Sequence, residues 1–271
     1  WRPVPGGKFT LGGDPKAWDA HEARTIDLPD PYWIASYPVT YAQYEAFVDD
    51  GGYTEEHRTC WTDGGWAWKG KKTRPKYAWD VPQWLIPSHP VVGVTWFEAY
   101  AFARWLETQR RAGKQAVALP AGMPDHYVIR LLTEAEWEKA ARLPDGRFFP
   151  WGNTYTSGQA NIDETDSQKV GEYYLQRTSA VGIYPQGKSH HGAFDLAGNV
   201  WEWCLSKWAD TYQHPEDNEP EGGTDVRRVL RGGSWYNHLV LARAASRGRA
   251  SAAYWYRDQG FRLVVGSPIP P

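Results

Sequence analysis

The motifs RGGSW at residues 231–235 and GFRLVV at residues 260–265 frame the stretch that decides the fold of this chain. Between them, residues 236–259 show no helical or strand period, which is typical of a loop. The Gly-Gly pair at 232–233 indicates a turn at one end, and Phe261–Val265 predicts a strand at the other. Recognition residues collect on loops that are held rigidly at both ends. The pattern therefore favours a binding function for this segment.

Length and charge set the limits for the whole chain. Its 271 residues can bury a sizeable core. No Gly/Ser linker, low-complexity tract or repeat of fixed period divides it, so we expect one domain over residues 1–271. A net charge of -2 and a pI near 6.5 give no electrostatic footprint for nucleic acid. No apolar run is long enough to span a bilayer. We therefore expect neither nucleic acid nor a membrane span among its interactions.

Aromatic residues are the outlier in the composition. The chain has 17 Trp and 16 Tyr beside one Met, with 27 Gly and 20 Pro that indicate many turns. We expect most of the rings to fill the core and the others to line a ligand surface. Cys60 and Cys204 are too few for a disulfide framework, which makes the cytoplasm the default compartment. Because the chain begins at Trp1 rather than Met, export stays open.

Local patterns predict three helices and several short strands. The helices begin after Thr40, Thr95 and Thr133, each with an apolar stripe behind the cap. Glu98 and Glu136 complete capping boxes three residues after Thr95 and Thr133. The first helix is expected to stop at Gly51-Gly52 and the second near Arg111, and the predicted strands are Lys8–Leu11, Ile26–Leu28 and Tyr32–Ser36. Few short elements joined by long irregular loops predict an α+β fold.

Seven sequence blocks follow one another along nearly the whole chain. They are YPVTYAQY (37–44), HPVVGVTW (89–96), RLLTEAEW (130–137), FPWGN (149–153), DLAGNVWEW (195–203), RGGSW (231–235) and GFR (260–262). Together they resemble the formylglycine-generating-enzyme family of sulfatase-modifying proteins, a branch of the C-type lectin fold. The resemblance implies an α+β fold of that type. It leaves the chemistry open, because function belongs to the site rather than to the fold.

The resemblance also defines the chemistry to be tested. In the oxidase branch of the family, two cysteines soon after RGGS bind copper and react with the substrate. The residues after Ser234 contain no cysteine, and Asn237 stands about where the first would fall. Copper(I) requires soft thiolate ligands, so we expect no copper here. Cys60 and Cys204 lie outside the segment and are expected to be lone buried thiols.

Two further branches of the family offer alternatives. The iron-dependent sulfoxide synthases carry their histidine ligands on an additional N-terminal helical domain, which this sequence lacks. The variable proteins of diversity-generating retroelements are non-catalytic, and mutagenesis of AAY codons randomises their surface positions without reaching Lys, Glu, Gln, Met or Trp. Between Tyr236 and Asp258 the chain contains no Lys, Glu, Gln or Met, and one Trp, Trp255. This composition is similar to that of a variable segment.

On this basis we expect a non-catalytic scaffold with a diversifiable surface over about 231–265, which binds an unknown protein or cell-surface ligand. An enzyme of the same family with altered chemistry, and a module that docks one fixed partner, remain as alternatives. Tyr and Trp give large, stiff contact area, although the same rings could also fill the core. The residues predicted to contact the ligand are Tyr236, Asn237, His238, Val240, Ser246, Gly248, Ala250, Ala253, Tyr254, Trp255, Tyr256 and Asp258.

Two further sets of residues are expected to support this surface. Guanidinium groups can fix loops through carboxylates and carbonyls, so Arg231, Arg243, Arg247 and Arg262 are interpreted as scaffold. The resemblance also implies a structural calcium ion, because family members bind one with carboxylate and carbonyl oxygens in the DLAGNVWE block. The alternative for its last acid is an ion pair with a scaffold arginine. The predicted calcium ligands are Asp195, Gly198, Val200 and Glu202.

Overall fold

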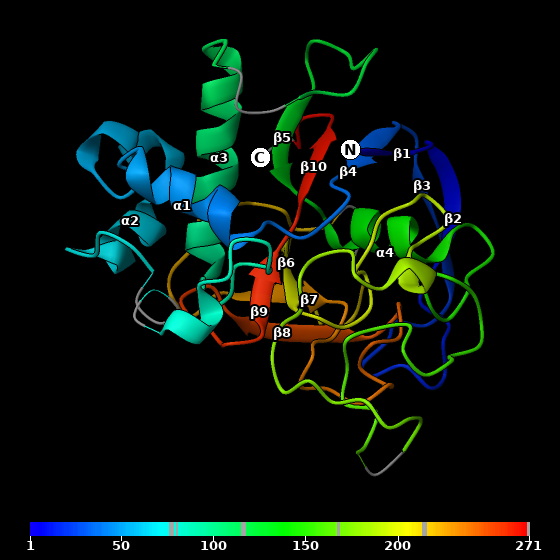
Figure 1. Ribbon diagram of the computed structural model, residues 1–271. Coiled ribbons are helices and arrows are strands. Elements are labelled where there is room, and N and C mark those ends of the chain that lie inside the picture. Colours follow the sequence, from blue (N-terminus) through cyan, green and yellow to red (C-terminus); the bar gives the residue numbers. More distant parts are fainter. Residues whose placement is uncertain (76–78, 80, 115–117, 167–168, 213–215, 270–271) are drawn as a thin grey trace.

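The computed structural model describes residues 1–271 except 76–78, 80, 115–117, 167–168, 213–215 and 270–271 (Figure 1). Within these ranges the strands form three small sheets, and the helices pack around them. Long irregular stretches connect the elements, most visibly over residues 143–200. The predicted α+β class is therefore confirmed.

The first sheet joins the two ends of the chain. Its order is β1 (Arg2–Val4), β4 (Tyr32–Ile34), β10 (Leu263–Gly266) and β5 (Val128–Leu131), with all neighbours antiparallel. Figure 1 shows β10, in red, between the green β5 and the blue β4. A separate hairpin pairs β2 (Gly7–Leu11) with β3 (Arg24–Leu28). The predicted strands at the start of the chain and near its end are thus present.

The second large sheet carries the RGGSW and GFR motifs. Its order is β8 (Arg247–Ser251), β7 (Arg227–Arg231), β6 (Trp201–Lys207) and β9 (Gln259–Phe261). Strands β6 and β9 are parallel, and Trp201 pairs in register with Gln259. Through this pairing, the residues that follow the predicted loop lie beside the last three residues of the DLAGNVWEW block.

The helices begin where their caps predict. They are α1 (Tyr41–Asp49), α2 (Asp63–Lys69), α3 (Trp96–Arg111) and α4 (Glu134–Arg142), with 3-10 turns at Glu55–Cys60, Pro82–Trp84 and Pro185–Gly187. Thr40, Thr95 and Thr133 each accept a hydrogen bond from the third residue of their helix, and a side chain there bonds back to the cap. In the part of the chain that the structure describes, no helix is both long and apolar enough to cross a bilayer.

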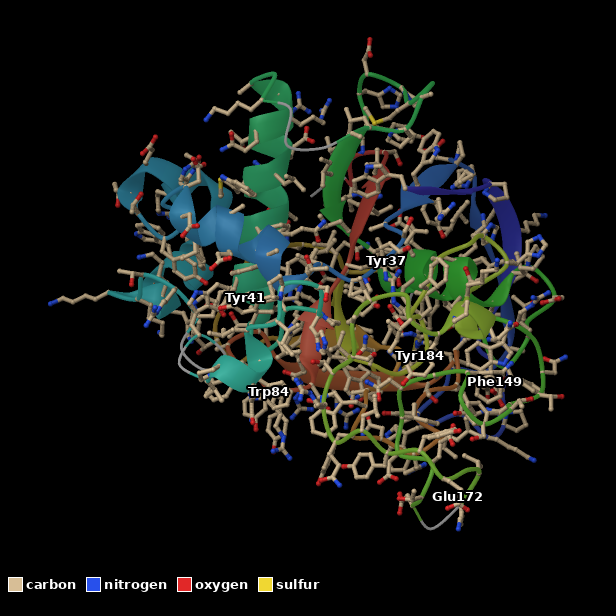
Figure 2. All side chains as sticks on the ribbon, viewed as in Figure 1. Tyr37, Tyr41, Trp84, Phe149, Glu172 and Tyr184 are labelled. Atoms are coloured by element: carbon tan, nitrogen blue, oxygen red, sulfur yellow. The ribbon has the colours of Figure 1, made fainter. Side chains whose placement is uncertain are left out.

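Buried aromatic residues of α1 and α3 pack with residues of the sheets in one core cluster, and Figure 2 labels Tyr41 of α1, which belongs to it. Tyr44 stacks on Phe102 at 5.3 Å, and Phe102 meets the edge of Phe261 of β9 at 5.5 Å. Trp84 packs against Trp235 of the RGGSW motif at 6.0 Å. Stacked and edge-on rings of this kind add to the energy of simple area burial. The motif at the C-terminal end is therefore anchored to rings from the middle of the chain.

The four scaffold arginines are buried ion-pair partners, as predicted. Arg231 donates to Glu134 and Glu138 of α4, and Arg247 donates to Glu134 at 2.6 Å. Arg243 donates to Asp14 at 2.6 Å, and Arg262 donates to Glu202 at 2.7 Å. The four guanidinium groups are at most 10% exposed, and their acidic partners at most 4%. Removing one partner of such a pair costs about 3–5 kcal/mol, because the other charge stays buried.

One prediction about the segment 236–259 is wrong. It was expected to be loop throughout, yet residues 247–251 form β8 and pair antiparallel with β7. The strand reads RGRAS and has no apolar alternation, because its inward position is occupied by the ion-paired Arg247 instead of an apolar side chain. A pattern search for apolar residues therefore cannot find it.

Candidate functional site

A pocket of about 470 Å³ opens beside the edge of β8, and we call it the Asp258 pocket. Its outer residues come from distant parts of the chain: Trp18 and Asp19, Tyr236, Arg249 and Tyr256. The buried residues that line it include Trp201, Asp258 and Gln259, together with Leu230 and Arg247. The parallel pairing of β6 with β9 brings the first three together, because Trp201 N donates to Asp258 O and pairs with Gln259. The end of the segment after RGGSW thus lies beside the first residues of β6 and β9.

A second pocket of about 440 Å³ adjoins the first and shares Tyr236 and Tyr256 with it. Ala253, Tyr254, Trp255 and Arg257 complete its lining. Tyr254 and Tyr256 stack with their ring centres 5.7 Å apart. Arg257 lies over the rings of Trp235 and Tyr236, 5.4 and 5.5 Å from their centres. An aromatic rim therefore separates the two hollows.

Asp258 is the acidic group buried at the first pocket. It is 7% exposed, and burial raises the pKa of its carboxyl group. Ser234 Oγ lies 2.7 Å from Asp258 Oδ2 and 2.9 Å from Asn237 Oδ1. One hydroxyl proton can serve only one of these acceptors at a time, so Asp258 and Asn237 compete for the hydrogen bond that Ser234 donates. A carboxyl group of raised pKa in a pocket is a candidate for acid–base chemistry.

Gln259 supplies a second unusual group. Its side chain is 7% exposed, and Oε1 has no hydrogen-bond partner among the described residues. Leaving a buried acceptor unpaired costs about 1–3 kcal/mol, so such atoms are rare in folded proteins. Gln259 is also among the residues that line the Asp258 pocket.

Three of the twelve residues predicted to contact the ligand are exposed. Tyr236, Tyr254 and Tyr256 are 53%, 51% and 47% exposed, so the three rings are not core filler. The half-buried members of the set are Asn237, His238, Val240, Gly248, Ala250, Ala253 and Trp255. Their exposure leaves them available for contact, and the contact role itself stays a prediction.

Two members of the predicted set are not exposed. Ser246 is fully buried, because its Oγ accepts from Trp18 N at 3.0 Å and donates to Val240 O at 2.6 Å. It fixes the loop that carries Trp18 instead of facing solvent. Asp258 is buried as well, although it lines the pocket. Sequence reasoning placed both on the surface because they lie in a segment without apolar period.

Several pocket residues were not predicted from the sequence. Trp18 and Asp19 lie more than 200 residues before the segment, and Trp201 belongs to the DLAGNVWEW block. Gln259 is the last residue of the segment but was not among the predicted contacts. Arg249 lies inside the segment but was not among the predicted contacts. A Cβ placed on Gly248 would lie 3.2 Å from the Trp201 ring, so a larger residue there requires that ring to shift slightly. No local signal reveals these contacts, since β-pairing and loop packing create them.

The thiols do not form a copper site. Cys60 and Cys204 are both buried and free, as predicted, and burial raises the pKa of each. At the position of the family's first cysteine, Asn237 accepts hydrogen bonds from Ser234. The residues present therefore do not fit copper(I). Within the described ranges, no three His, Cys, Asp or Glu side chains are placed to hold a metal ion.

Asp195, Gly198 and Val200, three of the predicted calcium ligands, lie in the turn before β6, and Glu202 lies within β6. Asp195, Gly198 and Asn199 all have positive φ angles, and burial raises the pKa of Asp195 to about 6. Glu202, however, accepts from Arg262 at 2.7 Å and from Trp137 Nε1 at 2.7 Å. The ion pair weighed as the alternative for Glu202 is thus present, and Arg262 already neutralises its charge. Calcium binding by Asp195, Gly198, Val200 and Glu202 stays a prediction.

Solved structures define the class of this protein. It is similar to PvdO from Pseudomonas aeruginosa, with a TM-score of 0.66 over 97% of this chain and 92% of that one, at 23% identity. Treponema denticola variable protein 1 gives a TM-score of 0.65 over 97% and 94%, also at 23% identity. Together with the arrangement of sheets and loops, these likenesses assign the C-type lectin fold of the formylglycine-generating-enzyme type.

Residues 3–266 match the family described as the sulfatase-modifying factor enzyme 1-like domain, and the chain belongs to this family. Hercynine oxygenase of Mycolicibacterium thermoresistibile is 36% identical over 84% of this chain and 50% of its own length. The formylglycine-generating enzyme of Thermomonospora curvata is 32% identical over 97% of this chain and 92% of its own length. The chain thus spans about half the length of the hercynine oxygenases that it matches.

These relatives correct the prediction of a non-catalytic protein. Proteins 30–36% identical to this chain are named as enzymes, which points to an enzyme here as well. The prediction gave too much weight to the missing cysteine pair. Its absence removes one way of holding a redox metal, but a family can keep a substrate pocket while its other groups change.

Proposed function

We propose that this chain forms the substrate-binding part of an oxidising enzyme and that the substrate occupies the Asp258 pocket. The similarity to hercynine oxygenases and formylglycine-generating enzymes supports the reaction class. The pocket supports the location, because it combines a buried carboxyl group with aromatic walls. Ligand pockets typically have this composition, with a few convergent polar groups in an apolar lining.

The observation that carries this proposal is the environment of Asp258. Burial raises the pKa of its carboxyl group, while the hydrogen bond from Ser234 opposes that rise. The carboxyl group can therefore hold a proton or release one close to the substrate. Ser234 Oγ, 2.7 Å away, donates to this carboxyl group and holds it in place at the pocket. General acid–base catalysis of this kind contributes about 10²–10⁴-fold to a rate.

The redox centre is proposed to come from groups outside the described residues. Hercynine oxygenases of about twice the matched length support this division. The family resemblance implies the same division, with histidine ligands on a separate domain in the iron-dependent branch. A redox metal held there would supply electron transfer with oxygen. In this chain, Tyr236, Tyr254 and Tyr256 then form the rim that recognises the substrate.

Asp258→Asn tests the proposal directly. Oxygen uptake by the natively expressed protein would be followed with hercynine and, separately, with a cysteine-containing sulfatase peptide, and products would be identified by mass spectrometry. We expect Asp258→Asn to lower turnover about a hundredfold or more, because the amide cannot exchange a proton. Asp225→Asn, on an exposed turn, is the matched control and should leave turnover unchanged.

Two results would contradict the proposal. Turnover by Asp258→Asn at the rate of the unchanged protein would remove the acid–base role. Oxygen uptake that depends on neither compound would remove the oxidising activity on these substrates. Whether residues 236–258 are diversified is a separate question, which a reverse transcriptase gene and a template copy of the segment in the neighbouring DNA would answer.

A further inference from the structure

We propose that the Asp258 pocket binds a positively charged group with N–H donors, such as a primary ammonium or a guanidinium. This inference rests on the proposed function only in taking the pocket as the substrate site. It names the chemical class of the group that enters. Three features of the pocket carry it: its unpaired acceptors, its aromatic faces and its balance of charge.

The unpaired groups at the pocket are acceptors. Gln259 Oε1 is buried without a hydrogen-bond partner among the described residues. Its neighbour Asp258 has the only carboxyl group among the buried lining residues, and Ser234 contacts one of its oxygens. Asp19 adds a half-exposed carboxylate at the rim, where it faces Arg249 at 3.3 Å. An ammonium group brings three donors and a guanidinium brings five, which is enough to serve both Gln259 Oε1 and the carboxyl group of Asp258.

The walls suit a cation as well. Tyr236, Tyr256 and Trp201 line the pocket, and Trp18 at its mouth is 60% exposed. The faces of Trp and Tyr rings attract ammonium and guanidinium groups, and the attraction grows as water is removed. The protein already uses this contact nearby, because Arg257 lies over Trp235 and Tyr236.

The two arginines of the lining do not repel such a ligand strongly, because both are already committed. Arg247 is buried, donates to both oxygens of Glu134 and lies 3.8 Å from the centre of the Trp208 ring. Arg249 faces Asp19 at 3.3 Å and Asp210 at 3.6 Å. Two acids thus surround the exposed arginine, so both arginines of the lining already have acidic partners and repel an entering cation little.

Four probes that share a butyl chain and differ in the polar end would test the chemical class of the ligand. They are butylammonium, butylguanidinium, butanol and pentanoate. Their dissociation constants for the natively expressed protein would be measured by isothermal titration calorimetry or by chemical shifts. We expect one or both cations to bind about tenfold or more tightly than butanol, as charge-assisted hydrogen bonds imply. Pentanoate should bind more weakly than butanol. Equal binding of all four probes, or tighter binding of pentanoate, would overturn the proposal.

Two variants locate the binding. Gln259→Leu removes the unpaired oxygen at nearly constant volume, and we expect it to weaken cation binding about tenfold while butanol binding stays unchanged. Gln186→Leu, at an exposed position, is the matched control. Tyr256→Ala removes an exposed ring, which carries little risk to folding, and should weaken cation binding several-fold through the lost ring face. Tyr173→Ala, which is 61% exposed elsewhere, is its control. Cation binding that ignores both pocket variants would overturn the location.

The outcomes separate this inference from the proposed function. If Asp258→Asn abolishes turnover but cations bind no better than butanol, the ligand class is wrong and the acid–base role stands. If cations bind in the pocket but Asp258→Asn turns over normally, the ligand class stands and the catalytic role of Asp258 is wrong.

Discussion

At Ser234, a single hydroxyl proton faces two acceptors, Asp258 Oδ2 and Asn237 Oδ1. This competition links the proton on Asp258 to the conformation of the turn after RGGSW. The sequence predicted contact positions in this segment, and the exposure of its tyrosines agrees with it. It could not predict that Asp258 is buried, because burial here depends on Trp201, which is 57 residues away in the chain but adjacent in the sheet.

Ser234→Ala should raise the pH at which Asp258 titrates. The Ser234 hydrogen bond favours the carboxylate, so its loss leaves burial unopposed and raises the pKa of Asp258 further. Because the folded protein then keeps this proton over a wider pH range than the unfolded chain, stability should fall more as pH rises through that range. Carbon-13 NMR of the Asp258 carboxyl group would measure the titration, with Ser36→Ala as the control. A midpoint that stays the same or decreases in Ser234→Ala would contradict this account.

Among the elements, helices were easier to predict than strands. The caps at Thr40, Thr95 and Thr133 act within one turn, so four neighbouring residues determine where each helix starts. Strand β8 is the opposite case, because it depends on pairing with β7 and on the ion pair between Arg247 and Glu134. Local pattern therefore predicts α3 and α4 but describes β8 as loop.

Arg247→Met should destabilise the protein by about 3–5 kcal/mol, because Glu134 loses a bidentate partner in a buried site. Urea denaturation would measure the loss in the free energy of unfolding. Arg227→Met, at the exposed start of β7, is the matched control and should change stability by no more than about 0.5 kcal/mol. If the two variants were equally stable, the buried ion pair would not be what holds β8 in place.

At the scale of the whole molecule, strand β10 connects the beginning, middle and end of the chain. Val264 pairs with Ile34 of β4 and with Arg130 of β5, and Figure 1 shows β10 between these two strands. The terminal strand was predicted from its apolar run, but its central position in the sheet was not. Sheet order depends on contacts far apart in sequence, which a linear pattern does not contain.

Val264→Ala tests this central position. The side chain is fully buried, so we expect a loss of about 2–4 kcal/mol in the free energy of unfolding, from lost burial and a residual cavity. Val240→Ala, in the half-buried stretch after RGGSW, should cost well under half of that. Denaturation followed by both tryptophan fluorescence and circular dichroism should show one shared transition for Val264→Ala. A loss confined to one probe would indicate that β10 does not unite the fold.

The chain of buried charges from Arg142 through Glu138, Arg231 and Glu134 to Arg247 has a practical consequence for protein engineering. These ion pairs fix the inner side of β8, and none of them involves the exposed tyrosines at 236, 254 and 256. A combinatorial library built on this scaffold should therefore vary positions 236, 254 and 256 and leave Arg247 and Gly248 untouched. New specificities could then be selected from this face without re-optimising the body that displays it.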